Sequence, residues 1–349
     1  MKRKRRQSSG SLQSVTMHDV AKESGVSPMT VSRVLAGRRT VDPELRRRVL
    51  AAARRLDYVP NALASSFSRN RAGFLGVATA YKELLGTAFF REIMIGFQSA
   101  IRGTELDFAL FDCTSEAFRN PKGLARIYRQ KKAGGLLIMA PRMEDSYLRT
   151  LSEMGVAFII SGDQVGDPDI PSVCCNDAQG IELMVAHLFQ LGHREIAFIE
   201  GPDQLGSAKR RSDAFRKCMA DAGLSVPKHF VQPGDYTVPR ARESAMRLLK
   251  CKRRPTAIMC ANDLTAKGAV LAARECRLRI PADLSIAGFD DLLSPEENDM
   301  ALTTIHQPVR EIGYLAARRL LDFMKTGERV RGHVDVDVSL VVRDTTGRV

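Results

Sequence analysis

The sequence predicts an N-terminal all-α headpiece of helix-turn-helix form, followed by an α/β body of two doubly wound, parallel-sheet lobes. Three observations predict this fold class. Short helical patterns interrupted by glycine occupy residues 16–60, short apolar runs alternate with helical patterns from residue 73 onward, and the run 74–103 resembles the run 196–223. Strands that alternate with helices are typical of parallel sheets covered by helices on both faces, and the repeat indicates two similar lobes.

The composition is that of a soluble globular protein. The chain has 349 residues, 44% of them hydrophobic and 27% charged, which is enough for two or three domains. No apolar run approaches the ~18 residues of a membrane span, and the polar stretch Ser8–Ser14 stands where a secretory leader needs an apolar core. Seven cysteines without a CxxC pair are typical of reduced thiols. We expect a cytoplasmic protein with no membrane partner.

The positive charge is concentrated at one end of the chain. The formal net charge is +13, and residues 1–71 hold sixteen Lys/Arg against five Asp/Glu. This fifth of the chain therefore carries nearly all of the excess. A basic module attached to a near-neutral body favours a polyanion as partner, although a charged face that only keeps the protein soluble would give the same numbers.

The local pattern favours a polyanion as partner over a merely solubilising face, because the basic region has the pattern of a three-helix headpiece. A basic leader over 1–15, expected to be disordered, precedes a helix over 17–24 that ends at Gly25. A second helix is predicted over 28–35 and a third over 43–57. The predicted N-caps are Thr16, Ser27 and Asp42. Two helices joined by a short glycine turn form a helix-turn-helix.

The second helix directs its polar residues outward. Its spacing buries Val31 and Val34 and leaves Thr30, Ser32 and Arg33 exposed. In a helix-turn-helix the second helix enters the major groove of DNA. These three side chains are therefore the expected groove readers.

The body pattern comprises seven strands and six helices after a short polar linker at 61–72. The strands are expected at 74–78, 108–113, 136–139, 157–160, 196–199, 257–260 and 285–288. The helices are expected at 89–102, 178–191, 208–222, 239–250, 264–276 and 307–325.

Polar side chains follow three of these strands, where ligands bind in parallel sheets. They are Ser207, Arg210, Arg211, Asn262 and Asp290. Each alone could be a helix cap or turn residue, whereas together they supply donors and acceptors for sugar hydroxyls. The sequence has no phosphate-binding glycine loop, no zinc-ligand spacing and no nucleophile motif. We therefore expect no cofactor, no metal site and no catalytic residue.

Residues 17–71 resemble the headpiece of the lactose-repressor (LacI/GalR) family of bacterial transcription regulators, and the resemblance extends over nearly the whole chain. The matching runs are DVAKESGVS at 19–27, TVSRVL at 30–35, YVPN at 58–61, LGHR at 191–194, CAND at 260–263, GFDD at 288–291 and LTTI at 302–305. The resemblance implies lobes of periplasmic-binding-protein type, the first over about 73–174 and 307–334, the second over 175–306 and 335–349. It also implies a homodimer.

The resemblance further implies which residues contact a near-palindromic operator. They are Thr16, Ser27, Pro28, Met29, Thr30, Ser32, Arg33, Asn61, Ala64 and Phe67. Residues 61–72 would form a hinge that becomes helical on DNA, or simply a flexible linker. Phe67 stands where relatives insert a leucine into the minor groove, and an apolar wedge of this kind kinks DNA. Packing of Phe67 on the body is the alternative.

For the body, the resemblance implies a small-molecule effector, a sugar or sugar derivative, between the lobes. Its expected contacts are Phe89, Phe90, Ser207, Arg211, Asn262 and Asp290. Arg210 is a rival of Arg211 for the same role, and Tyr81, Ser161 and Asp163 are weaker candidates. Leu205 stands where purine-binding relatives carry arginine, which disfavours a purine.

Together these patterns predict a sequence-specific DNA-binding transcription regulator, a repressor controlled by a small molecule, and not an enzyme. Two other classes share parts of the pattern. A solute-binding protein would have the same body but would need a secretory leader and has no use for the basic headpiece. A sugar-modifying α/β enzyme would need an acid/base pair in the cleft, and Asp290 with Asp291 is the only adjacent carboxylate pair among the strand-end residues.

Overall fold

A computed structural model describes residues 15–35, 37, 40–59, 73–79, 81–112, 121–143, 147–294, 296 and 301–349. The chain divides into two compact units, with the boundary between Gly73 and Phe74. We call them the headpiece and the body and describe each by itself. The expected basic leader (all but residue 15) and nearly all of the expected hinge, with Asn61, Ala64 and Phe67, lie outside the described residues.

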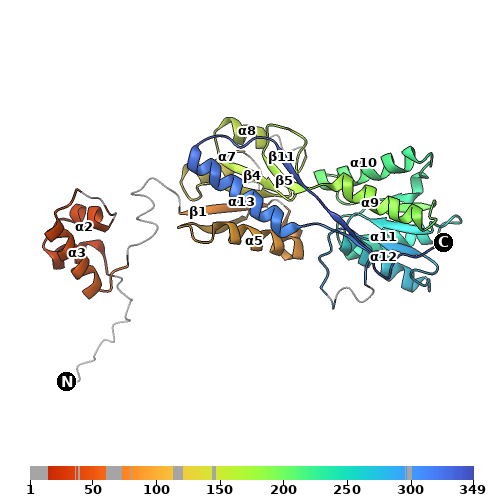
Figure 1. The fold of residues 1–349 in the computed structure, drawn as a ribbon, viewed down its shortest axis with the longest axis horizontal. Coiled ribbons are helices and arrows are strands. Elements are labelled where there is room, and N and C mark those ends of the chain that lie inside the picture. Colours follow the sequence, from red (N-terminus) through yellow and green to blue (C-terminus); the bar gives the residue numbers. More distant parts are fainter. Residues whose placement is uncertain are drawn as a thin grey trace, which may run out of the picture. The chain divides into compact units, whose positions relative to one another are not determined.

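The headpiece contains three helices around a small apolar core (Figure 1). They are α1 (Met17–Ser24), α2 (Pro28–Leu35) and α3 (Pro43–Arg55). Val20, Val31 and Val49, one from each helix, are fully buried and contact one another in a single cluster. The third helix ends two residues earlier than its pattern predicts, because Asp57 has a left-handed backbone (φ 49°) that leaves the helix.

The first sheet of the body is six-stranded and parallel. Its order is β11-β5-β4-β3-β1-β2. The strands are β1 (Phe74–Thr79), β2 (Asp107–Asp112), β3 (Leu136–Met139), β4 (Phe158–Ser161), β5 (Ser172–Cys175) and β11 (His333–Val336). Helices α5 (Ala88–Ile101) and α13 (Val309–Thr326) cover one face, and α7 (Pro121–Arg129) and α8 (Tyr147–Glu153) cover the other (Figure 1). A short 3-10 helix, η1 (Lys82–Gly86), follows β1.

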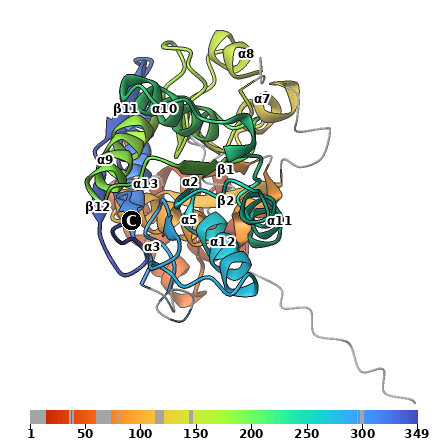
Figure 2. The same ribbon diagram turned by 90° about the vertical axis from the view of Figure 1, so that its right-hand side faces the viewer.

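The second sheet has four parallel strands in the order β7-β6-β8-β9. They are β6 (Ile196–Ile199), β7 (Val231–Gln232), β8 (Ala257–Cys260) and β9 (Ser285–Ala287). Figure 2 shows α9 (Asp177–Gln190) and α10 (Gly206–Asp221) on one face, with α11 (Val238–Leu249) and α12 (Asp263–Glu275) on the other. A 3-10 turn, η2 (Lys228–Phe230), precedes β7.

The chain crosses between the two sheets at three places. It passes from β5 into α9, from the antiparallel strand β10 (Thr304–His306) into α13, and from β11 into β12 (Ser339–Val341), which pairs with β10. We call the parts built around the first and second sheets the first and second lobes. Parallel sheets with helices on both faces agree with the fold class that the sequence predicts.

Two glycines set the distance between α5 and α13. A Cβ atom on Gly96 would lie 1.9 Å from the carbonyl oxygen of Arg310, and one on Gly313 would lie 2.2 Å from that of Ile93. The two helix backbones are therefore in direct contact, which only glycine permits at these positions.

Among the described residues, no helix is both long enough and apolar enough to cross a membrane.

Candidate DNA-binding surface and ligand cavity

The N-terminal caps of α1 and α2 use several of the polar side chains expected at DNA. Thr16 forms a capping box with Asp19: its hydroxyl donates to Oδ2 (2.6 Å) and accepts from the Asp19 amide (3.3 Å). The two hydrogen bonds that Asp19 Oδ2 accepts from Thr16, one from the hydroxyl and one from the backbone amide (2.8 Å), lower the pKa of Asp19. Ser27 Oγ accepts from the amide of Thr30 (3.2 Å) and lies 2.9 Å from its hydroxyl. Thr16, Ser27 and Thr30 thus stabilise the helix ends whatever else they contact.

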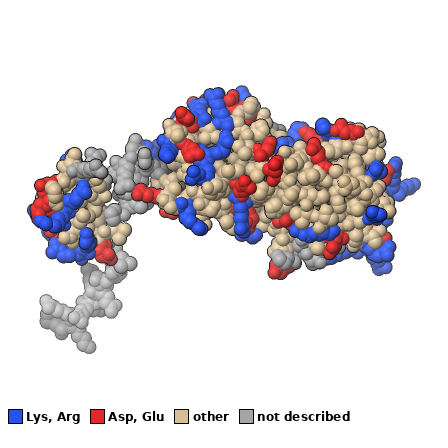
Figure 3. All heavy atoms as spheres, in the orientation of Figure 1, with Lys and Arg blue, Asp and Glu red and all other residues tan. Residues whose placement is uncertain are grey.

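Met29 and Arg33 remain directed to solvent on α2. Met29 is 65% exposed, although it is apolar, and the exposed Arg33 has no polar contact with another described residue. Other basic side chains of the headpiece have partners: Arg48 donates to the carbonyl of Ser24 (2.7 Å), and Arg55 pairs with Glu23 (3.2 Å). In Figure 3, lysine and arginine side chains form patches on the visible face of the headpiece. An exposed methionine beside an arginine can contact base edges in the major groove.

A cavity of about 430 Å³ lies between the two lobes of the body. The first lobe contributes the segments after β1 and β4 and the start of α5, and the second lobe contributes the segments after β6, β7, β8 and β9. These positions are at the carboxyl ends of parallel strands, where α/β sheets bind ligands. The lining side chains that bear on ligand binding are Tyr81, Phe89, Asp163, Ser207, Arg211, Tyr236, Asn262, Asp263, Asp290 and Gln307.

The cavity brings together five of the six residues expected at an effector: Phe89, Ser207, Arg211, Asn262 and Asp290. Phe90 does not line it and instead packs, partly buried, against an apolar cluster that includes residues of both lobes. Of the weaker candidates, Tyr81 and Asp163 line the cavity, whereas Ser161 does not.

Arg211 is a buried residue of the cavity wall, and most of its N–H donors already bond other groups of the protein. Its Nε donates to Asp177 Oδ1 (2.7 Å), and its Nη1 donates to the carbonyl of Ala261 and lies 3.6 Å from Asp290 Oδ1. The guanidinium also stacks on the ring of Phe289, 3.6 Å from the centroid. Because an arginine has five N–H groups, few of them are left for a ligand.

Asn262 both caps a helix and lines the cavity, which are the two roles that the sequence left open. Its Oδ1 caps α12 by accepting from the amide (2.8 Å) and the hydroxyl (2.6 Å) of Thr265. The side-chain amide nitrogen contacts no other described residue through a hydrogen bond, and the residue lines the cavity. An amide nitrogen offers two donors, so the cap orients the donors that a ligand can use.

Asp263 is a buried carboxylate, and Asp290 on a neighbouring segment is a largely buried one whose side chain is 13% exposed. Asp290 accepts from Gln307 Nε2, and Asp263 accepts from Thr304 Oγ1 (2.6 Å) and from the amide of Leu292 (3.1 Å). Burial raises the pKa of both side chains, and the Asp290 carboxylate raises that of Asp263 further. The backbone of Asp290 has φ 128°, a strained conformation held by its pairing with His306.

Four residues of this region were not expected from the sequence. Tyr236 and Gln307 line the cavity, Asp235 contributes its backbone carbonyl to Tyr81 Oη (2.9 Å), and Asp177 pairs with Arg211. Tyr236 has a left-handed backbone (φ 65°), and burial raises its pKa. Asp235 and Tyr236 follow β7, a two-residue strand too short to give a sequence pattern.

A helix-turn-helix headpiece attached to a two-lobed body with a ligand-sized cavity defines a transcription regulator that binds DNA. The family model "Bacterial regulatory proteins, lacI family" matches residues 16–61, and the model "Periplasmic binding protein-like domain" matches residues 185–346. The chain belongs to the LacI family of bacterial regulators.

Relatives and solved structures agree with this assignment. The transcriptional repressor PurR of Klebsiella pneumoniae is 31% identical over 94% of this chain and 96% of the relative, and PurR of Proteus mirabilis is also 31% identical over the same shares. The lac repressor dimer bound to operator and the anti-inducer ONPF superposes with a TM-score of 0.83 at 29% identity, covering 96% of this chain and 100% of that one. The complex of the regulator CelR with cellobiose gives 0.73 at 25% identity, covering 95% and 99%.

Proposed function

We propose that this protein is a homodimeric repressor whose operator affinity is controlled by a neutral, polyhydroxylated ligand of the sugar class, bound in the cavity between the lobes. The observation that carries this proposal is the composition of the cavity wall. Carboxylate acceptors, an amide donor and a guanidinium surround one space of about 430 Å³ together with aromatic rings. Such a mixture matches a molecule that carries many hydroxyl groups on an apolar ring.

The charges around the cavity favour a neutral ligand over an anionic one. Asp163, Asp235, Asp263 and Asp290 line it, and Arg211 is already paired with the buried Asp177. The other guanidinium of the lining, that of Arg91, is 64% exposed and pairs with Glu92 through Nε (3.3 Å). A phosphate group would lie near several carboxylates with only this exposed guanidinium to receive it, and burying an incompletely paired charge is costly. Sugar phosphates are therefore disfavoured.

The relatives support the ligand class and the dimer. The CelR structure holds cellobiose, and a lac repressor structure holds ONPG. The lac repressor bound to operator is a dimer. Two headpieces on one dimer would read the two halves of a near-palindromic operator.

On DNA, we propose that Met29 and Arg33 of α2 contact base edges and that Pro28 and Ser32 lie against the groove beside them. Thr16, Ser27 and Thr30 would contact the phosphate backbone from the helix ends, where exposed N–H groups attract anions. Residues 61–72, with Asn61, Ala64 and Phe67, would form the hinge in the minor groove.

Two measurements test the function. A thermal-shift screen of the purified full chain uses matched pairs, each a sugar and its phosphate, together with nucleobases. We expect only the neutral sugars to stabilise the protein. A ligand at a hundredfold excess over its Kd adds about 2.7 kcal/mol of stability.

Selection from random DNA is expected to return an inverted repeat, and the Arg33→Ala variant is expected to lose the preference for it. Hits confined to sugar phosphates or nucleobases would contradict the ligand class. If the selection enriched no DNA sequence, that result would contradict the function as a regulator.

A further inference from the structure

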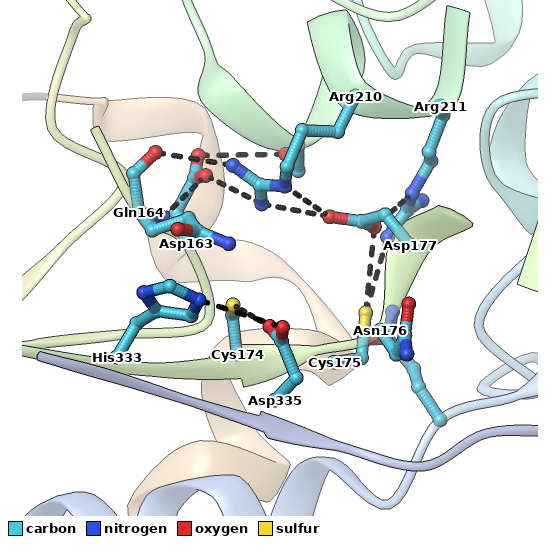
Figure 4. Close-up of polar contacts among 12 residues, drawn as sticks. Asp163, Gln164, Cys174, Cys175, Asn176, Asp177, Arg210, Arg211, His333 and Asp335 are labelled. Carbon is cyan, nitrogen blue, oxygen red and sulfur yellow. Dashed lines mark hydrogen bonds and ion pairs between the residues drawn. The ribbon is translucent and has the colours of Figure 1, made fainter. Parts of the chain in front are cut away.

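Arg210 and Arg211 are neighbours on α10, yet they point to different parts of the body (Figure 4). Arg211 stays within the second lobe, over Phe289 and beside Ala261. Arg210 reaches across to the segment that follows β4 in the first lobe. Its Nη2 donates to Asp163 Oδ1 (3.1 Å), and its Nη1 donates to the carbonyl of Gln164 (3.1 Å).

The same guanidinium holds a second carboxylate on its own side. Nε and Nη2 of Arg210 donate to Asp177 Oδ2 at 2.9 and 2.7 Å. Asp177 opens α9, which packs against α10 in the second lobe. Arg210 therefore bonds the first lobe with one edge and the second lobe with the other, which the fixed fork of a guanidinium allows and a lysine ammonium does not.

Other contacts bring the same two segments together. Ser207 Oγ donates to Asp163 Oδ2 (3.4 Å), and the amide of Met143 in the first lobe donates to the carbonyl of Gln204 (2.9 Å). A Cβ atom on Gly206 would lie 2.1 Å from the carbonyl oxygen of Gln164. The backbone of the loop that leads into α10 is thus in direct contact with the backbone of the first lobe.

Among these contacts, Arg210 is the main partner of Asp163, because its guanidinium compensates the charge of that carboxylate. Asp163 is only 3% exposed, and burial raises its pKa, an effect that Arg210 opposes. A buried carboxylate that loses its cation is strongly unfavourable. When the lobes separate, water can solvate Asp163, while Arg210 keeps Asp177 as a partner and is not left uncompensated. Both the observed arrangement and one with separated lobes would therefore leave these charges compensated.

We propose that Arg210 is a positioning residue that clasps the two lobes through Asp163 and Gln164, so that the cavity is closed and preorganised before any ligand binds. Asp163 is then presented at the cavity wall as a fixed acceptor. A ligand that enters meets a site whose closure is already complete, so its binding energy is not spent on bringing the lobes together. The proposal requires no particular ligand, and its test is independent of the function proposed above.

Hydrogen exchange of the full-length protein without ligand, followed by mass spectrometry, tests the clasp. Arg210→Leu is expected to speed exchange about tenfold or more in peptides that contain Met143 and Gln164, because local opening exposes their amides. Peptides from α12 are expected to be unchanged. Arg216→Leu is the matched control, since Arg216 lies on the same helix and pairs with Glu200 within the second lobe (3.0 Å).

Further variants separate a clasp from a general loss of stability. Asp163→Asn removes the charge from the first lobe and leaves the pair of Arg210 with Asp177 intact. It is expected to speed exchange at Met143 as Arg210→Leu does, and the double variant is expected to add little. Arg210→Lys is expected to restore protection only in part. Unchanged exchange at Met143 in both single variants, or faster exchange confined to α9 and α10, would overturn the proposal.

Discussion

Asp177 at the start of α9 and Arg211 on α10 form an ion pair in which Nε and Oδ1 are 2.7 Å apart and neither side chain is more than 5% exposed. Arg210 shares the same carboxylate. Burial opposes the charge of Asp177, but the two guanidinium groups outweigh it and lower the pKa of Asp177 below its ordinary value. One buried carboxylate thus holds the two adjacent arginines of α10, one facing each lobe.

Replacing this carboxylate is expected to destabilise the body severely. Asp177→Asn leaves the buried guanidinium of Arg211 and the half-buried one of Arg210 with less compensation, and breaking a buried pair costs about 3–5 kcal/mol. Denaturant unfolding of the full chain measures the change. Asp213→Asn on the same α10 removes an exposed carboxylate paired with Lys209, and we expect a change of about 1 kcal/mol or less. Equal effects of the two variants would contradict the importance of burial.

The dependence of stability on pH is expected to change in Asp263→Asn. The folded protein raises the pKa of Asp263, so the native state binds this proton more tightly than the unfolded chain does. The stability from this group is present below about pH 4, the ordinary aspartate range, and is lost as the pH rises. Asp263→Asn removes this loss, so its free energy of unfolding should decline less than that of the wild type between pH 5 and 8.

Asp283→Asn provides the control for that slope. Arg279 lowers the pKa of Asp283, so this half-buried carboxylate is ionised in both states throughout the same pH range. Its replacement is expected to shift the stability by a constant amount. A slope that is unaltered in Asp263→Asn would show that Asp263 does not titrate in this range.

Gly96→Ala is expected to destabilise the first lobe, although alanine favours helices. The added Cβ would meet the backbone of α13 at 1.9 Å from the Arg310 oxygen, and overpacking of this kind costs about 1–3 kcal/mol. The gain in helix propensity, at most about 1 kcal/mol, does not offset it. Chemical denaturation measures the difference. Gly86→Ala, whose Cβ would meet nothing within 4 Å, should leave the stability nearly unchanged.

Met29→Ala is expected to weaken binding to the selected operator about tenfold, or about 1.4 kcal/mol, through a lost apolar contact with a base. Because no phosphate contact is removed, the dependence of the binding constant on salt should stay as in the wild type. Titration of labelled operator at several salt concentrations measures both quantities. Val342→Ala, at a position 57% exposed on the body, should change neither.

The sequence predicts the headpiece and the central strands well because their patterns are local. Ile196–Ile199 and Ala257–Cys260 are buried on both faces and read as continuous apolar runs. The strand β11 alternates between exposed and half-buried residues at a sheet edge, and β7 has only two residues. Such strands form because they pair with distant segments, and this pairing requires no recognisable hydrophobic pattern in the strand itself.

The cavity was predictable where strand ends carry polar residues, as at Asn262 and Asp290. Asp177 was not, because its partners Arg210 and Arg211 lie on another helix, and a buried ion pair has no signature in either segment. The role of Arg210 likewise depends on where Asp163 lies in the folded body. Sequence reasoning therefore left the two arginines as rivals, whereas the structure gives each a different partner set.

The first sheet takes its edge strand β11 from near the end of the chain, and α13 covers its face only after the second lobe has been crossed. A ribosome must therefore synthesise the chain as far as residue 336 before the first sheet can be completed. The headpiece, by contrast, has all three of its helices once residue 55 has emerged. During translation, the headpiece is thus able to fold well before the cavity between the lobes exists.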